Sequence, residues 1–161
     1  MTCTIRPIRA ADNPAVEAII RGCLIEFGAN HEGTAWMDPD LGRFSEIYTG
    51  DGCRYWVAED EAGAVIGGAG IGPLPGAPGV CELQKMYCLP PARGTGAARQ
   101  LMEAALAYAR VRYRRCYLET LGNMTAAHRF YEKFGFVRLE KPLGATGHYA
   151  CDVLYSKELS P

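Results

Sequence analysis

The stretch Arg93-Gly94-Thr95-Gly96-Ala97-Ala98 joins an apolar segment, residues 86–91, to a segment of helical composition, residues 99–106. A strand, a turn of small residues and a helix start, in this order, form a binding site for an anion. The first backbone N–H groups of a helix lack partners, and the helix dipole adds about half a positive charge there. Glycine lets phosphate oxygens approach these N–H groups without interference from a Cβ atom. The stretch therefore predicts a phosphorylated ligand.

The spacing of the glycines excludes two common nucleotide-binding loops. No lysine follows Gly96, as a Walker-type phosphate loop would require. The dinucleotide fingerprint needs three glycines directly after the first strand, whereas this loop lies more than halfway along the chain. Without further context, the six residues fit an ordinary strand-to-helix turn as well as an anion site.

Length and composition indicate one globular domain, residues 1–161. Of the 161 residues, 48% are hydrophobic and 22% are charged, which is the balance of an ordinary soluble protein. The formal net charge of −1 gives no reason to expect nucleic acid or a membrane surface as a partner. No apolar run approaches the roughly 20 residues of a membrane-spanning helix. Residues 1–6 lack the pattern of a signal peptide, so a cytoplasmic location is expected.

The seven cysteines and three histidines are scattered along the chain, with no Cys-x-x-Cys pair. An odd number of separated cysteines is typical of reduced thiols rather than of a disulfide framework or a zinc site. We therefore expect neither disulfides nor a metal.

Apolar periodicity and turn residues predict seven strands and three long helices. The predicted strands cover residues 3–9, 55–58, 64–67, 80–89, 116–120, 136–140 and 149–157, and the predicted helices cover residues 13–27, 97–109 and 125–134. Residues 28–50 are irregular, with a short helix expected from Asp40 to Tyr48. This order predicts an α/β (α+β) fold with a central mixed sheet flanked by helices.

A second motif occupies residues 123–136. Asn123 precedes a helix start, small residues follow within one turn, Tyr131 lies near the helix end, and Gly135-Phe136 comes next. Together with the loop at residues 93–98, this segment resembles the two signatures of the GNAT superfamily of acetyl-CoA-dependent N-acetyltransferases. The signatures stand in the family's order, separated by a predicted helix and strand, and the match covers roughly residues 80–137.

The resemblance implies a splayed sheet whose fourth and fifth strands part to admit the pantetheine arm of acetyl-CoA, the cosubstrate. In the family, backbone groups of the fourth strand pair with the pantetheine, and the loop before the next helix holds the pyrophosphate. Carried over by position, the implied cofactor-binding residues are Met86, Tyr87 and Cys88 on the strand, Arg93, Gly94, Thr95, Gly96, Ala97, Ala98 and Arg99 in the loop and helix start, and Asn123 on the fifth-strand side.

The same resemblance implies the catalytic groups. Tyr131 falls where the family carries the tyrosine that protonates the departing thiolate, and core packing is the alternative role for this side chain. Glu82 lies four residues before Met86, where one branch of the family carries a catalytic glutamate, and a partly desolvated carboxylate there would have a raised pKa. Glu119 and a water molecule are competing bases. A backbone N–H from residues 86–88 is the expected oxyanion donor.

Two further side chains invite a catalytic interpretation that the sequence does not favour. His128 shares a helix face with Tyr131, but a single histidine on a helix more often packs or faces solvent. Cys88 could act as a nucleophile, yet nothing nearby in the sequence would activate its thiol, and family members transfer the acetyl group directly. We expect both residues to serve packing.

The resemblance implies an N-acetyltransferase that moves an acetyl group from acetyl-CoA to a primary amine by direct attack in a ternary complex. Between residues 26 and 51, six acidic residues against one arginine favour a small cationic amine as acceptor, or else form an ordinary solvated surface. The alternatives are a protein acetyltransferase acting on lysines or N-termini, and a non-catalytic acyl-CoA-binding sensor. Pairing of edge strands would allow a homodimer.

Overall fold

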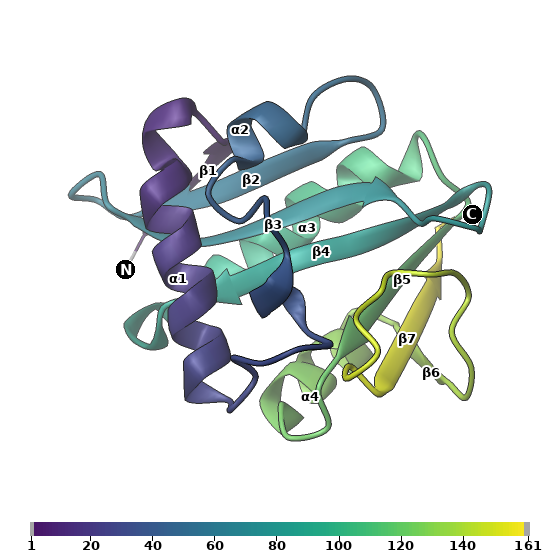
Figure 1. Ribbon diagram of the computed structural model, residues 1–161. Helices are drawn as coiled ribbons and strands as arrows, with labels where there is room; N and C mark the ends of the chain where they lie inside the picture. Colours follow the sequence, from purple (N-terminus) through teal and green to yellow (C-terminus); the bar gives the residue numbers. More distant parts are fainter. Residues whose placement is uncertain (1, 160–161) are drawn as a thin grey trace.

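The computed structural model describes residues 2–159, which build a seven-stranded sheet in the order β1-β2-β3-β4-β5-β7-β6 (Figure 1). The strands are β1 (Thr4–Pro7), β2 (Arg54–Glu59), β3 (Val65–Pro73), β4 (Val80–Cys88), β5 (Arg115–Thr120), β6 (Val137–Leu139) and β7 (Val153–Glu158). Neighbouring strands are antiparallel except for β4 and β5, which run parallel. The predicted α/β class with a central mixed sheet is confirmed.

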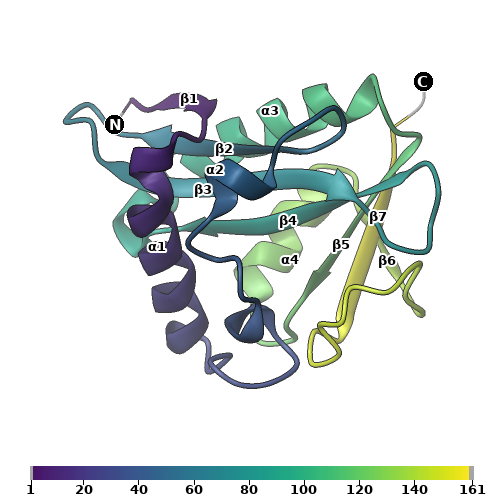
Figure 2. The same cartoon turned by 45° about the horizontal axis from the view of Figure 1, so that its top comes forward.

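Helices cover both faces of this sheet. They are α1 (Asn13–Glu26), α2 (Phe44–Ile47), α3 (Ala97–Arg110) and α4 (Thr125–Lys133), with 3-10 turns η1 (Ala10–Asp12), η2 (Ala35–Met37) and η3 (Pro90–Ala92). Helices α1 and α2 lie on one face and α3 lies on the other (Figures 1 and 2). Side chains alternate along β2, so Tyr55 and Val57 pack in the core beneath α1 while Trp56 and Ala58 pack in the core beneath α3.

Strands β4 and β5 pair over only part of their length. Their register joins Val80 to Arg115, Cys81 to Cys116 and Glu82 to Tyr117, and no pairing follows. Strand β4 continues to Cys88, whereas β5 leaves the sheet direction at an angle (Figure 1). The backbone of β4 beyond Glu82 therefore has no neighbouring strand on its β5 side, as expected for a splayed sheet.

A β-bulge interrupts β4 where the two strands part. Gly68 pairs with Tyr87 and Gly70 pairs with Gln84, so residues 85 and 86 together oppose a single residue of β3. Lys85 takes a φ of 51°, in the left-handed region. The Tyr55 hydroxyl donates a hydrogen bond of 2.8 Å to the Lys85 carbonyl and so fixes the bulge from below.

Three predicted boundaries are wrong for identifiable reasons. The last strand begins at Val153 rather than at residue 149, because residues 148–150 fold over the α1–α2 segment instead, with the Ala150 N–H bonded to the Gly33 carbonyl at 2.9 Å. Strand β3 runs to Pro73 rather than to residue 67, because its glycines conceal the strand pattern. The short helix expected from Asp40 to Tyr48 is confined to α2, because residues 40–43 form a turn in which the Arg43 N–H donates to the Asp40 carbonyl at 2.9 Å.

None of the helices formed by residues 2–159 is long and apolar enough to cross a membrane. Within the same residues, no group of three or more His, Cys, Asp or Glu side chains is arranged to hold a metal ion.

Candidate active site

A cavity of about 360 Å³ opens between the end of β4, the loop that follows it and α4. Its wall is mainly apolar. Among the predicted cofactor-binding residues, it is lined by Met86, Tyr87, Cys88, Arg93, Gly94, Ala98 and Asn123, and the predicted catalytic Tyr131 also contributes. The remaining wall residues include Phe27 from the segment after α1 and Phe130 from α4. We call this space the large cavity.

The loop before α3 has the geometry that its sequence predicts. Gly94 and Gly96 take φ angles of 76° and 94°, which side chains with a Cβ rarely adopt. Gly96 is the N-cap of α3 and supplies no side-chain hydrogen bond to the first turn. A Cβ at Gly94 would meet no atom within 4 Å, so the space over this backbone is open. Thr95 differs from the rest, since its N–H and hydroxyl both bond to the Ala92 carbonyl and stabilise the turn itself.

Arg93 and Asn123 hold the end of α1 across the large cavity. The Arg93 guanidinium donates to the Glu26 carboxylate at 2.7 and 2.8 Å and to the Cys88 carbonyl at 3.2 Å. The Asn123 amide donates to the Phe27 carbonyl at 2.9 Å. Both side chains were predicted to contact the cofactor, and both are engaged with the protein in this structure, one from the β4 side and one from the β5 side.

A second cavity, of about 100 Å³, lies on the other side of the gap between β4 and β5. We call it the small cavity. Its polar lining includes Glu82, Gln84 and Lys85 from β4, Glu119 and Thr120 from β5, and His148 from the segment before β7. The two cavities share five wall residues, which are Met86, Tyr87, Met124, Ala127 and Tyr131. The cavities therefore meet between the β4 bulge and α4.

Tyr131 lies at this meeting point. Its ring packs against Phe130, Phe136 and Tyr155, so the side chain contributes to core packing. Within residues 2–159, no fully buried side-chain polar atom lacks a hydrogen-bond partner, and none of the hydrogen bonds involves the Tyr131 hydroxyl. The hydroxyl is therefore open to the cavity. Burial raises the pKa of Tyr131 well above its usual value, so the phenol keeps its proton and can donate it.

Glu82 and Glu119 both line the small cavity but are held differently. Glu82 is 8% exposed and accepts a hydrogen bond of 2.8 Å from the Gln84 amide on one oxygen. Burial raises the pKa of Glu82 and outweighs this hydrogen bond, which lowers it. Glu119 accepts from the Tyr117 hydroxyl at 2.6 Å on one oxygen and from the Thr146 hydroxyl on the other. Glu82 therefore has the carboxylate better suited to accept a proton.

A cluster over the small cavity has no counterpart among the sequence predictions. The Lys85 ammonium lies 2.7 Å from the Asp38 carboxylate, and His148 Nε2 lies 3.0 Å from the same group. Burial alone would raise the pKa of Asp38, but the His148 hydrogen bond and the Lys85 charge together bring it below its usual value. Sequence reasoning could not find this cluster, because His148 and Asp38 are 110 residues apart and belong to no local motif.

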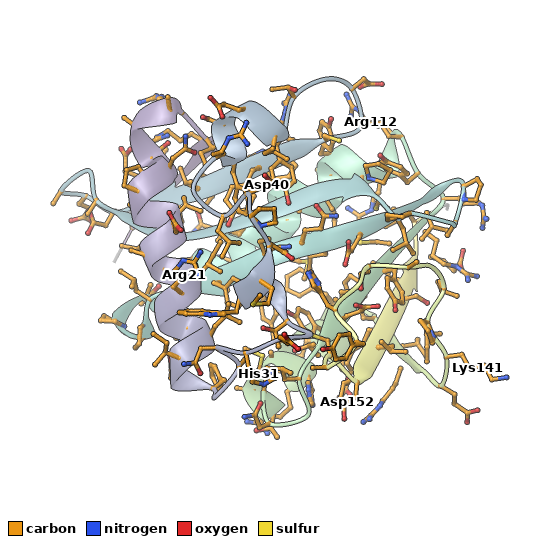
Figure 3. The ribbon with its side chains drawn as sticks, viewed as in Figure 1. Arg21, His31, Asp40, Arg112, Lys141 and Asp152 are labelled. Atoms are coloured by element: carbon orange, nitrogen blue, oxygen red, sulfur yellow. The ribbon has the colours of Figure 1, made fainter. Side chains whose placement is uncertain are left out.

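The acidic segment between residues 26 and 51 contributes little to the small cavity. Glu26 pairs with Arg93, Asp40 and Glu46 pair with Arg43, and Asp51 pairs with Arg112. Arg112 lies on the opposite side of the molecule from α4 (Figures 1 and 3). Asp38 contacts Lys85 and His148, which both line the cavity. The carboxylates that line the cavity come from β4 and β5 instead.

His128 and Cys88 have surroundings that fit packing. His128 Nε2 lies 2.9 Å from the Leu121 carbonyl, and its ring contacts Tyr155. Cys88 is buried, and burial raises the pKa of its thiol to about 11, which makes it a poor nucleophile near neutral pH.

Comparison with known proteins identifies the family. The model of the acetyltransferase (GNAT) family matches residues 18–136. This range contains the residues of β4 and α4 that line the two cavities. The chain belongs to the GNAT family. This GNAT protein is therefore an acyltransferase enzyme, as the two sequence signatures predicted.

Relatives agree with this assignment. The GNAT chain is 42% identical over 158 residues to the uncharacterized N-acetyltransferase YjgM of Escherichia coli (strain K12), a match that covers 96% of this chain and 94% of that one. A GNAT acetyltransferase from Staphylococcus aureus Mu50 shares the fold with a TM-score of 0.87 at 18% identity, covering 98% and 99% of the two chains. A phosphinothricin acetyltransferase from Sinorhizobium meliloti, solved in complex with acetyl-CoA, has a TM-score of 0.78 at 24% identity and 99% and 90% coverage.

Proposed function

We propose that this GNAT protein transfers the acetyl group of acetyl-CoA to the primary amine of a small cationic molecule, by direct attack in a ternary complex. The observation that carries the proposal is the meeting of two cavities of unequal size and polarity beside Tyr131, which lines both. One substrate enters from each side of the gap between β4 and β5. Both substrates must be bound together for the amine to reach the thioester, which is what direct transfer requires.

The large cavity suits acetyl-CoA. Its apolar wall fits the pantetheine arm. Residues 86–88 of β4 have no strand on their β5 side, so backbone groups there can pair with the pantetheine amides as a sheet strand would. The open backbone at Gly94 and the uncapped first turn of α3 suit the pyrophosphate. A relative solved with acetyl-CoA has the same fold, which supports this cosubstrate.

The small cavity favours a compact cation over a protein. It is the smaller of the two cavities, at about 100 Å³ against about 360 Å³, and this suits a compact molecule better than a peptide. Glu82 and Glu119 supply negative charge, whereas the Lys85 ammonium is offset by Asp38. The contacts of Ala150 with Gly33 and of His148 with Asp38 cover the cavity, and an open peptide groove would lack such a cover.

The chemistry follows from these positions. Glu82 accepts a proton from the amine, and the amine nitrogen attacks the thioester carbon to form the C–N bond. A backbone N–H from residues 86–88 stabilises the oxyanion. As the C–S bond breaks, Tyr131 donates its proton to the sulfur, so that the amide and CoA thiol leave. Glu82 then releases its proton to solvent and Tyr131 takes one up, so both side chains return to their starting states.

A thiol-release assay with acetyl-CoA and a panel of amines tests the proposal. The panel should contain short diamines, amino sugars, amino acids and lysine peptides at matched concentrations. We expect turnover with compact cationic amines and little with peptides. Turnover with peptides alone would favour a protein acetyltransferase instead. Tight CoA binding without turnover on any amine would favour a sensor.

A further inference from the structure

A chain of two hydrogen bonds leads from α2 to Glu82. The Tyr48 hydroxyl, just after α2, donates to Gln84 Oε1 at 2.7 Å, and Gln84 Nε2 donates to Glu82 Oε1 at 2.8 Å. Gln84 and Glu82 stand two residues apart on β4, so their side chains share one face of the strand. We call the three side chains the Tyr48–Gln84–Glu82 relay.

The relay has a fixed direction. A phenol has one proton to donate, and a carboxylate only accepts, so the intervening amide must turn its oxygen to Tyr48 and its NH₂ to Glu82. Burial raises the pKa of Tyr48 far above the physiological range, so this donor is always present. Without the Tyr48 proton the amide is no longer held, and it can rotate so that its oxygen faces the carboxylate.

Strand β3 is shaped to make room for the relay. A Cβ at Gly70 would lie 2.9 Å from the Tyr48 ring, and a Cβ at Gly72 would lie 3.0 Å from Gln84 Oε1. The Tyr48 ring is also held from two sides, by Phe44 at 5.2 Å and by Tyr55 at 5.3 Å between ring centroids. The relay is therefore a built feature of the fold and not a chance contact of surface side chains.

Other charged groups face Glu82 from each neighbouring element. Glu119 on β5 raises the pKa of Glu82, while Lys85 on β4 and His148 from the segment before β7 lower it. Tyr131 on α4 lines the same cavity and stays protonated. None of these groups is within hydrogen-bond distance of Glu82 in residues 2–159, so the Gln84 amide is the one direct partner of the carboxylate there.

We propose that Tyr48 and Gln84 are positioning residues of the acetyl transfer, holding Oε1 of Glu82 as an acceptor so that Oε2 faces the amine. This inference rests on the proposed function, in which Glu82 is the base. Tyr48 lies outside both cavities, whereas Gln84 lines the small cavity beside Glu82. They act through Glu82 by fixing its orientation and by stabilising its ionised form.

Tyr48→Phe and Gln84→Met test the relay, since each removes a link while keeping the shape of the side chain. A hydrogen bond to a charged group is worth roughly one pKa unit or slightly more. We therefore expect the acid limb of kcat/KM to move up by about one pH unit in both variants. At pH values on the acid side of that limb, kcat/KM of each variant should be about tenfold lower than that of wild type. Tyr113→Phe is the matched control, because its hydroxyl bonds to the Gly52 carbonyl at 2.8 Å, outside both cavities, and its profile should not move.

A double variant separates positioning from a general structural effect. In a Glu82→Gln background, adding Tyr48→Phe should cost nothing further, because the relay then has no base to position. An equal loss in the wild-type and Glu82→Gln backgrounds would overturn the inference. Circular dichroism and thermal melting of each variant confirm that it is folded.

A direct titration tests the relay independently of turnover. The carboxyl ¹³C resonance of Glu82, assigned by its loss in Glu82→Gln, should titrate about one unit higher in Tyr48→Phe than in wild type. An unshifted resonance overturns the relay and leaves the proposed function intact. A shifted resonance with an unchanged rate profile upholds the relay and removes Glu82 as the base of the proposed function.

Discussion

Replacement of Tyr131 by phenylalanine removes a hydroxyl that lies at the meeting point of the two cavities and makes no hydrogen bond to residues 2–159. The ring contacts with Phe130, Phe136 and Tyr155 remain. We therefore expect no loss of folding stability, because no internal hydrogen bond is broken. If the hydroxyl protonates the departing thiolate, kcat should fall roughly 100-fold or more, the usual contribution of a positioned acid.

Tyr155→Phe is the matched control, because we expect it to lower stability while leaving turnover unchanged. The Tyr155 ring packs against Tyr131, but its hydroxyl donates to the Glu132 carboxylate at 2.7 Å, away from both cavities. Loss of this bond should cost about 1 kcal/mol or somewhat more and lower the melting temperature by roughly 2–4 °C for a chain of this length. Turnover should stay close to wild type.

Three measurements decide the comparison. Thiol release gives kcat and both KM values, calorimetric titration gives the affinity for CoA, and thermal melting gives stability. We expect Tyr131→Phe to lose kcat with unchanged CoA affinity and melting temperature. Full turnover in Tyr131→Phe would refute the acid role and leave Tyr131 as a packing residue. A parallel loss of CoA affinity would show that the hydroxyl binds the cosubstrate instead. Because burial raises the pKa of Tyr131, the wild-type rate should show no decline from its ionisation near pH 10.

Three further changes test other parts of the site. Gly94→Ala puts a Cβ into open space at a φ of 76°, and the backbone strain should lower the stability measured by thermal melting by about 1–2 kcal/mol. Initial rates should show a higher KM for acetyl-CoA. An unchanged KM would remove the loop from the binding site. Glu119→Gln removes a carboxylate from the small cavity and should raise KM for a cationic amine several-fold without changing KM for acetyl-CoA; a shift in acetyl-CoA alone would contradict the assignment of the cavities. Burial raises the pKa of Asp38, but His148 and Lys85 lower it by more, so the pKa in the folded protein is below the ordinary carboxyl value. The ionised Asp38 therefore stabilises the fold above the ordinary carboxyl pKa, and this stabilisation is lost as the pH falls through the lower folded pKa. Urea midpoints should therefore drop between about pH 5 and pH 2 less steeply in Asp38→Asn than in wild type, and identical slopes would disprove the ion-pair contribution.

The sequence predicts well what depends on residues close together in the chain. The loop at residues 93–98 and the segment 123–136 each combine a helix start with the residues that shape it, so their local structure follows from spacing and glycine content. Their joint presence identified the family, which the comparisons confirm. The roles of individual residues in these segments remain predictions.

What the sequence did not predict depends on contacts between distant segments. Lys85 looks like an ordinary exposed strand lysine until the bulge turns it toward Asp38, and His148 reaches Asp38 only because the segment before β7 folds over η2. The six acidic residues before residue 52 suggested a cationic acceptor, but Glu26 and Asp51 pair with arginines far along the chain, and Asp40 and Glu46 pair with the nearby Arg43. The charge that faces the small cavity comes from β4 and β5 instead.

The glycines of β3 connect the wrong strand prediction to the site. Gly68, Gly70 and Gly72 are every second residue of the strand, so all three positions lie on the α1 face of the sheet and none has a side chain there. Each leaves room that a Cβ would fill, for the Tyr55 ring at Gly68, for the Tyr48 ring at Gly70 and for the Gln84 amide at Gly72.

Tyr55 then anchors the bulge in β4 through the Lys85 carbonyl, while Tyr48 and Gln84 reach Glu82. The residues that weaken β3 as a strand by sequence are therefore the ones that let neighbouring aromatic side chains shape β4. Gly72 lines neither cavity, but a methyl group there would push the amide of Gln84, which lines the small cavity. The low strand propensity of this segment and the geometry of the proposed base thus have one physical cause.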